Sequence, residues 1–158
     1  MRKLERKLLG VGGERVALRP DHFARAIVQD GQTFAGAGAA LVRGEVSGCH
    51  QNVARLWIKR RRKGFAIVAG WALSDDGCWR QHTWGLEEGG VVETTLERTA
   101  YFGVVLDVAQ SAKFCFDNAA ADLDAAWPKL MKNDPAFRAV ILALAEDADS
   151  ITIRRTPS

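Results

Sequence analysis

The sequence is poor in the residues that build disulfide-held or metal-held frameworks. It has only 3 cysteines and 4 prolines among 158 residues, and no Cys-x-x-Cys pair. An odd number of cysteines without framework spacing predicts free thiols and a reducing compartment. A chain of this length can bury a core large enough to fold without disulfides or a metal ion.

Long apolar segments are also missing. No uninterrupted apolar run reaches the roughly 20 residues of a transmembrane helix, and the charged stretch from Met1 to Leu9 lacks the apolar part of a secretion signal. We therefore expect a cytoplasmic protein without a membrane partner. With 47% hydrophobic and 26% charged residues, the composition is that of a globular protein, and we expect one domain over 1–158.

The net charge is only +3, but five consecutive basic residues lie at 59–63. We interpret them as the solvated end of a helix, where cations suit the helix dipole. No aromatic residues interleave the run, so nucleic acid is not an expected partner. The sequence predicts neither another partner for this run nor an oligomeric state.

Periodicity predicts helices at both ends of the chain and strands between them. A helix is expected from Ser47, as its N-cap, to the basic run. Strand patterns separated by turn residues follow at 65–73, 78–86, 91–95 and 101–106.

The flanking segments complete this pattern. Before the central helix we expect a basic helix or arm at 2–9, an edge strand at 14–19 and a helix starting at 20–21. After the strands we expect a helix ended by Pro128, a helix at 136–145 and a last edge strand at 150–155. This order predicts an α+β fold: the helix that carries Cys49 packs on an antiparallel sheet, a meander at 65–106, flanked by N- and C-terminal helices.

The residues suited to chemistry at neutral pH gather between Ser47 and Gly103. Cys49 lies at the expected helix start, where unpaired N–H groups and the positive end of the dipole favour a thiolate. The alternative interpretation is that Cys49 is the first residue of the helix's apolar face.

Strand alternation places His82 on the same face as Arg80 and Trp84. Across the Gly89-Gly90 turn, Glu93 can lie beside His82 and orient its ring toward a thiol. A plain His–Glu pair between strands is the alternative. The leading hypothesis is a catalytic triad of Cys49, His82 and Glu93.

A cysteine at a helix start, then a strand histidine, then a polar residue on the next strand resembles the chain order of the papain-like Cys-His superfamily. That group includes the NlpC/P60 peptidases and the transglutaminase-like enzymes. Shared short stretches are also similar to short bacterial and phage proteins without an assigned activity: Cys49-His50-x-Asn52, Trp79-Arg80-x-His82-x-Trp84, Glu93-Thr94-Thr95, Arg98 and Tyr101-Phe102-Gly103. The resemblance implies a papain-like α+β domain and a thiol peptidase, amidase or deamidase without a cofactor.

Other residues of the same stretch are candidates for binding a small-molecule or peptide amide substrate. The arginines can hold an anionic group, the amide and imidazole can donate to a carbonyl, and the aromatic rings can wall a pocket. These candidates are His50, Asn52, Trp79, Arg80, Trp84, Arg98 and Tyr101.

Two other functions remain open. The pocket around Arg80, His82 and Arg98 can serve a non-catalytic module that binds a ligand or partner. Cys49-His50 together with Cys78-x-x-x-His82 offers four zinc-type ligands, although adjacent Cys and His ligands are unusual. We therefore expect no metal, and we expect Cys115 to be a buried hydrophobic residue.

Overall fold

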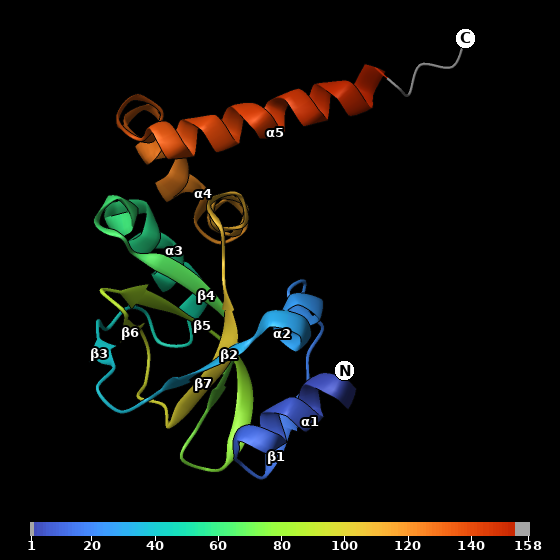
Figure 1. Ribbon diagram of the computed structural model, residues 1–158. Helices are drawn as coiled ribbons and strands as arrows, with labels where there is room; N and C mark the ends of the chain where they lie inside the picture. The colour runs from blue at the N-terminus through green and yellow to red at the C-terminus, as the bar shows by residue number, and fades with distance from the viewer. Residues whose placement is uncertain (1, 154–158) are drawn as a thin grey trace.

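The computed structural model describes residues 2–153. Its strands are β1 (Arg15–Ala17), β2 (Gln32–Ala35), β3 (Ala40–Leu41), β4 (Ala66–Leu73), β5 (Cys78–Glu87), β6 (Gly90–Glu93) and β7 (Ala100–Val105). They form one curled sheet in the order β2-β7-β4-β5-β6-β3, and β1 pairs with the other end of β5 (Figure 1). Together with the helices at both ends, this confirms the predicted α+β class.

The predicted three-stranded meander is present as β4, β5 and β6, which pair antiparallel in chain order. The fourth strand does not continue the meander, because β7 pairs with the opposite edge of β4. Two glycines permit this contact: Gly70 lies opposite Gly103, and a Cβ atom at Gly70 would meet the Phe102 carbonyl oxygen at 2.2 Å. The short strands β1 and β3 add parallel pairs, so the sheet is mixed.

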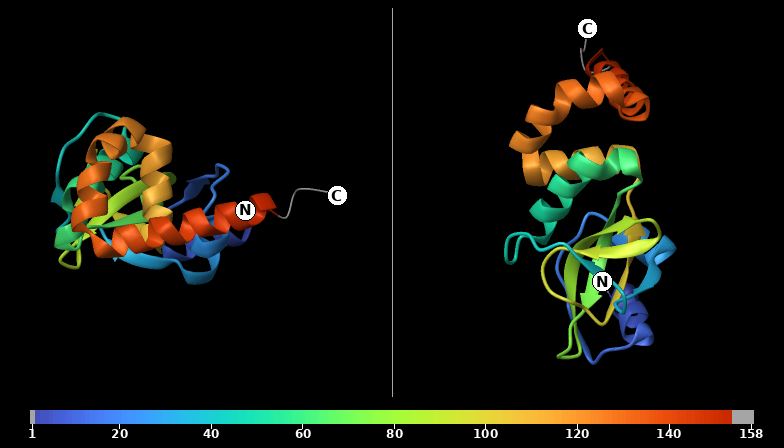
Figure 2. Two further views of the ribbon diagram at one scale, coloured as in Figure 1. Left: turned by 90° about the horizontal axis from the view of Figure 1, so that it is seen from above. Right: turned by 90° about the vertical axis from the view of Figure 1, so that its left-hand side faces the viewer.

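The helices are α1 (Arg2–Val11), α2 (Ala24–Asp30), α3 (Cys49–Arg60) with the 3₁₀ turn η1 (Arg61–Lys63), α4 (Val108–Asn133) and α5 (Pro135–Ile153). Helix α3 packs against both β5 and α4, while α5 lies beyond α4, away from the sheet (Figure 2). Among the described helices, none is long and apolar enough to cross a membrane.

Two expectations for the C-terminal helices are wrong. Helix α4 does not end at Pro128 but runs to Asn133, and its irregular point is Ala119 (φ −150°, ψ 46°). Pro128 lacks the N–H that would bond to the carbonyl of Asp124, an exposed residue. The strand expected at 150–155 is absent as far as the structure describes it: 150–153 belong to α5, and 154–155 lie outside the described residues.

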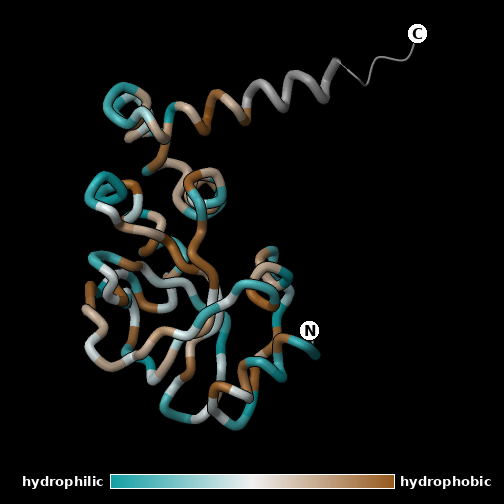
Figure 3. Tube along the Cα trace, viewed as in Figure 1, coloured by the Kyte–Doolittle hydropathy of each residue, from teal (hydrophilic) through white to brown (hydrophobic). Residues whose placement is uncertain are grey.

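Apolar side chains form two clusters on the two faces of the sheet. The larger cluster lies between the sheet and the helices and includes Ile67, Trp71 and Trp79. The smaller one contains only residues of the sheet and its loops, namely Val68, Ala72, Trp84, Val91 and Tyr101 with three partly buried neighbours. Hydrophobic residues also run from β7 into α4 through the middle of the molecule (Figure 3).

The basic run at 59–63 is only partly solvated. Arg61 is inside the helical layer, where its guanidinium lies over the rings of Trp57 and Phe137 and pairs with Asp134 at 3.0 Å. Arg60 pairs with Glu87. The expectation of a solvated helix end is therefore wrong for Arg61, which connects α3 to the start of α5, whereas Arg62 and Lys63 are exposed.

Candidate active site

Cys49 is the first residue of α3, but Ser47 is not its cap. The N-cap is Gly48, without a side-chain hydrogen bond, and Ser47 adopts a left-handed conformation with φ 61°. The chain turns tightly before the helix, where the Gly48 N–H donates to the Glu45 carbonyl at 3.2 Å. Since no side chain caps the helix, its first N–H groups remain available beside the thiol.

The loop before α3 is fixed by Asn52. Its Oδ1 accepts from the Glu45 N–H at 3.0 Å, and its Nδ2 donates to the Glu45 carbonyl at 2.8 Å. Gly44 makes this close approach possible, because a Cβ atom there would lie 2.3 Å from the Asn52 side chain. Asn52 is buried and holds the loop that presents Cys49, so its side chain is already engaged rather than turned to a substrate.

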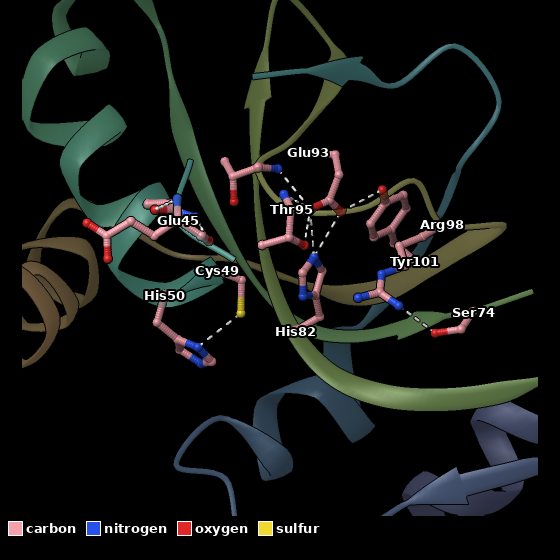
Figure 4. A network of polar contacts seen from close by, with 11 residues as sticks. Glu45, Cys49, His50, Ser74, His82, Glu93, Thr95, Arg98 and Tyr101 are labelled. Carbon is pink, nitrogen blue, oxygen red and sulfur yellow. Dashed lines mark hydrogen bonds and ion pairs between the residues drawn. The ribbon is translucent and has the colours of Figure 1, made fainter. Parts of the chain in front are cut away.

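His82 and Glu93 form a buried pair across β5 and β6. His82 Nε2 lies 2.9 Å from Glu93 Oε2 and 3.1 Å from Oε1, and the two residues are 4% and 0% exposed. Figure 4 shows His82 between Cys49 and Glu93. With Nε2 on Glu93, the other ring nitrogen, Nδ1, is the atom that remains for the thiol.

Glu93 is surrounded by hydrogen-bond donors. Its Oε1 accepts from the N–H groups of Thr94 and Thr95, both at 2.8 Å, and from Thr95 Oγ1 at 2.9 Å. Its Oε2 accepts from the Tyr101 hydroxyl at 2.9 Å. A carboxylate with this many donors is held ionised and in one orientation.

His50 is a second imidazole at the nucleophile. Its Nδ1 lies 3.2 Å from Cys49 Sγ (Figure 4). Its ring stacks on Phe114 with the ring centroids 5.7 Å apart. The adjacent cysteine and histidine therefore do meet, although the sequence suggested His50 as a substrate contact or a zinc-type ligand and not as a partner of the thiol.

The pKa values follow from these contacts. Burial disfavours the Cys49 thiolate, but the hydrogen bond with His50 and the interaction with the nearby imidazole of His82 outweigh it and lower the pKa from 9.0 to about 5. Burial would lower the pKa of His82, whereas its contacts with Cys49 and Glu93 raise it from 6.5 to about 9. Burial opposes ionisation of Glu93 as well, yet His82 and Thr95 lower its pKa to about 2. Between about pH 5 and pH 9, above the pKa of Cys49 and below that of His82, the site therefore holds a thiolate, an imidazolium and a carboxylate.

Tyr101 and Trp84 line the sheet side of this site. Both rings are buried, with centroids 4.9 Å apart, and each stacks near His82. Burial, together with the charge of Glu93 and the hydrogen bond to it, raises the pKa of the Tyr101 phenol above its ordinary value. Trp84 and Tyr101, which the sequence predicted as substrate contacts, therefore pack beside His82, and Tyr101 also holds Glu93 by a hydrogen bond.

Three predicted substrate residues lie elsewhere. Trp79 is on the opposite face of β5, where its Nε1 donates to the Gly12 carbonyl at 2.7 Å. Arg80 pairs with Asp76 through two hydrogen bonds of 2.8 and 2.7 Å beside the β4–β5 turn. Arg98 donates to Ser74 Oγ at 2.5 Å. The structure therefore does not gather these side chains around Cys49.

Sequence reasoning missed the two threonines that follow Glu93. Their N–H groups reach the carboxylate because the chain bends directly after β6, which strand periodicity does not reveal. The signal available in the sequence was a pair of threonines directly after an acidic residue of a predicted strand. In the part of the chain that is described, no group of three or more His, Cys, Asp or Glu side chains is placed to hold a metal ion, so the zinc-type ligand set of Cys49, His50, Cys78 and His82 finds no support.

Comparisons with known proteins add no relative. No family model matches the sequence, and neither a curated protein nor a solved structure matches it.

Proposed function

We propose that this protein is a thiol-dependent hydrolase or transferase that acts on an amide or other acyl bond. The observation that carries the proposal is the placement of Cys49 at an uncapped helix N-terminus, hydrogen-bonded to His50. His82 lies between this thiol and Glu93, to which it is hydrogen-bonded (Figure 4). The pKa values of about 5 for Cys49 and about 9 for His82 support a reactive thiolate at neutral pH. The order of these residues also supports the resemblance to the papain-like superfamily.

In the proposed reaction, Cys49 Sγ attacks the acyl carbon and forms a thioester. His82 gives its proton to the leaving nitrogen or oxygen as the bond to the acyl carbon breaks. Water, or an acceptor amine, then attacks the thioester and gives a proton back to His82, and the thiolate leaves. Glu93 holds His82 in orientation and stabilises its charge throughout.

The oxyanion that forms during each attack needs donors. The free N–H groups at the start of α3 provide them, since Gly48 has no side chain to compete. His50 stabilises the thiolate by its hydrogen bond to Cys49 Sγ.

The test is acyl-enzyme formation with p-nitrophenyl acetate. We expect a burst of nitrophenol equal to the protein concentration and one acetyl group on the peptide that contains Cys49. The burst should disappear in Cys49→Ala and persist in Cys115→Ala. If the parent protein gives no burst and no acetylated Cys49, the proposed chemistry is wrong.

The second candidate is a binding module that uses the same region without catalysis. The observation that favours it is a pocket of about 720 Å³ beside His50, a volume typical of ligand sites. A binding module would retain its ligand affinity in Cys49→Ser, whereas an enzyme would lose turnover.

A further inference from the structure

The pocket of about 720 Å³ lies between the segment that leads into α2 and the N-terminal half of α4. Its floor is formed by Ala69, Gln81 and Thr83, on the face of the sheet that packs against the helices. Ala69 and Thr83 are register partners on β4 and β5, so two small side chains meet at this point of the sheet. His82, between the two floor residues of β5, points to the opposite face of the sheet.

The charged groups of the lining are unequally matched. The Lys113 ammonium lies 2.9 Å from the Asp117 carboxylate, so these two charges largely cancel. Asp21 is the other acid of the lining, and its hydrogen-bond partners in the described part of the chain are neutral. The Phe23 N–H donates to its Oδ1 at 2.6 Å, and the Gln81 side chain donates to its Oδ2. With the lining histidines neutral, two carboxylates therefore face one ammonium, and negative charge is in excess.

The Asp21 carboxylate can accept further hydrogen bonds. Its two oxygens offer about four acceptor sites, and the protein uses one on each oxygen. Gln81 must turn its Nε2 toward the carboxylate, which leaves its own oxygen free to accept. Asn118 also has a free oxygen, since its Nδ2 donates to the Phe114 carbonyl at 2.8 Å, whereas Gln110 keeps its amide donors free because its oxygen caps α4. The lining thus combines free acceptors with an excess negative charge, which suits a donor that is a cation.

Aromatic rings give the rest of the lining an apolar surface. Phe23 and Phe114 line the pocket, and Phe114 stacks on the His50 ring with the ring centroids 5.7 Å apart. The face of an aromatic ring attracts a cation as well as an apolar group. A ligand with an apolar body and one ammonium group can therefore lay its body against these rings while its charge meets Asp21.

We infer that this pocket binds a small organic cation, an ammonium group on an apolar body, with Asp21 as the counter-ion. The inference goes beyond the proposed function, because it needs no reaction at Cys49. His50 belongs both to the pocket lining and to the contacts of the thiol, whereas neither Cys49 nor His82 lines the pocket. The ligand therefore meets the candidate active site at His50 and is not placed at a reacting bond.

The test compares three probes that share a phenyl ring and differ in the charge at the end of a short chain: phenethylamine, phenethyl alcohol and hydrocinnamate. Each is titrated into the isotope-labelled protein at neutral pH and physiological ionic strength, and its dissociation constant is taken from the shifts of the backbone amide signals. We expect phenethylamine to bind about tenfold more tightly than phenethyl alcohol, the effect of one charge-assisted hydrogen bond. Hydrocinnamate should bind most weakly, and the shifts should centre on Asp21, Gln81 and Thr83.

Two aspartate variants assign the preference to Asp21. Asp21→Asn removes the charge but keeps an oxygen for the Phe23 N–H, and Gln81 can turn its carboxamide to accept from the new amide. The preference for phenethylamine over phenethyl alcohol should disappear. Asp30→Asn is the matched control, because it removes an exposed carboxylate of α2 that does not line the pocket, and it should leave the preference unchanged.

Lys113→Gln changes the same charge balance in the opposite direction. It leaves Asp117 without its ammonium partner, so phenethylamine should bind about threefold more tightly. Lys132→Gln is the control, since it removes an exposed cation of the same helix outside the lining. The Lys113–Asp117 pair is largely exposed, so this variant keeps the test decisive if Asp21→Asn does not fold.

Equal affinities for phenethylamine and phenethyl alcohol, tighter binding of hydrocinnamate, or saturation by none of the probes would overturn the inference. So would amide shifts that centre outside the lining, or an undiminished preference in folded Asp21→Asn. These results leave the thiol chemistry untouched, because acetylation of Cys49 by p-nitrophenyl acetate is measured separately. A protein that binds phenethylamine but forms no acyl-enzyme would lose the proposed function and keep this site.

Discussion

Two thiols in the same pair of helices have opposite properties. Cys49 begins α3 and has a pKa of about 5, whereas Cys115 lies in the middle of the α3–α4 contact, where burial raises its pKa to about 12. Burial acts in the same direction on both. Cys115 is fully buried and has only a weak contact from Sγ to the Ala54 carbonyl at 3.6 Å, while Cys49 has two imidazoles beside it. The partners at the helix start, and not the depth of burial, decide which thiol can react.

The largest effect should come from Glu93→Gln, which removes the anion behind His82 and leaves several buried donors mismatched. We expect the free energy of unfolding at pH 7 to fall by about 3 kcal/mol. Because folding lowers the pKa of Glu93 from 4.5 to about 2, the carboxylate stabilises the fold fully above pH 4.5, and this contribution is lost as the pH falls toward about 2.

Urea unfolding of the parent and of Glu93→Gln at several pH values measures the loss of unfolding free energy and its pH dependence. The difference in unfolding free energy between parent and variant should be nearly constant between pH 5 and 6.5 and should narrow on acidification. It should also narrow between pH 6.5 and about 9, where His82 loses the proton that Glu93 stabilises. Asp76→Asn is the control, since Asp76 is a partly exposed carboxylate paired with Arg80, and it should have a much smaller effect. A difference that does not change with pH would show that Glu93 acts only by packing.

A second substitution, His82→Gln, should make the two thiols more alike. Without the imidazolium, the pH midpoint of Cys49 alkylation should move up from about 5 toward the ordinary thiol value, and the rate at pH 6 should fall about 100-fold. Iodoacetamide kinetics followed by peptide mass spectrometry report each cysteine separately. If the midpoint stays where it is in the parent, His82 is not the partner of the thiol. Cys115 should stay unmodified in both proteins while they remain folded.

His50→Gln should have a smaller effect in the same assay. Its Nδ1 gives the thiolate one hydrogen bond, which a glutamine amide can partly replace, so the rate at pH 6 should fall about tenfold. His22→Gln is the matched control, because His22 lies in the pocket lining but makes no hydrogen bond to the thiol. Equal losses in both variants would mean that the change reflects the pocket and not the contact with Cys49.

The sequence was sufficient for the parts of this site that depend on local pattern. Strand alternation and the Asp-Gly turn predict β4, β5 and β6, and alternation together with the Gly89-Gly90 turn puts His82 and Glu93 on one face. The helix that carries Cys49 follows from apolar spacing, although Ser47, its predicted N-cap, is wrong. The neighbourhood of Cys49, His82 and Glu93 was therefore predictable from three short segments.

The remaining features depend on contacts between distant segments or on a single backbone angle. That β7 pairs with β4 is fixed by the close approach of Gly70 and Gly103, which no local pattern encodes. Ser47 fails as a cap because the tight turn after Glu45 forces it into a left-handed conformation. The pocket arises only when Ala69 and Thr83 meet across two strands.

The smallest effect is expected from Cys115→Ala, which sharpens the comparison by removing the inert thiol. Sγ is fully buried and makes one weak contact to Ala54, so the loss is a small cavity worth about 1 kcal/mol of unfolding free energy. The midpoint of Cys49 alkylation should not move, because no hydrogen bond connects the two thiols. Urea unfolding and iodoacetamide kinetics on the same preparation measure both quantities. A shifted midpoint would mean that the α3–α4 packing sets the position of the helix start, and that the reactivity of Cys49 depends on the core as well as on its two imidazoles.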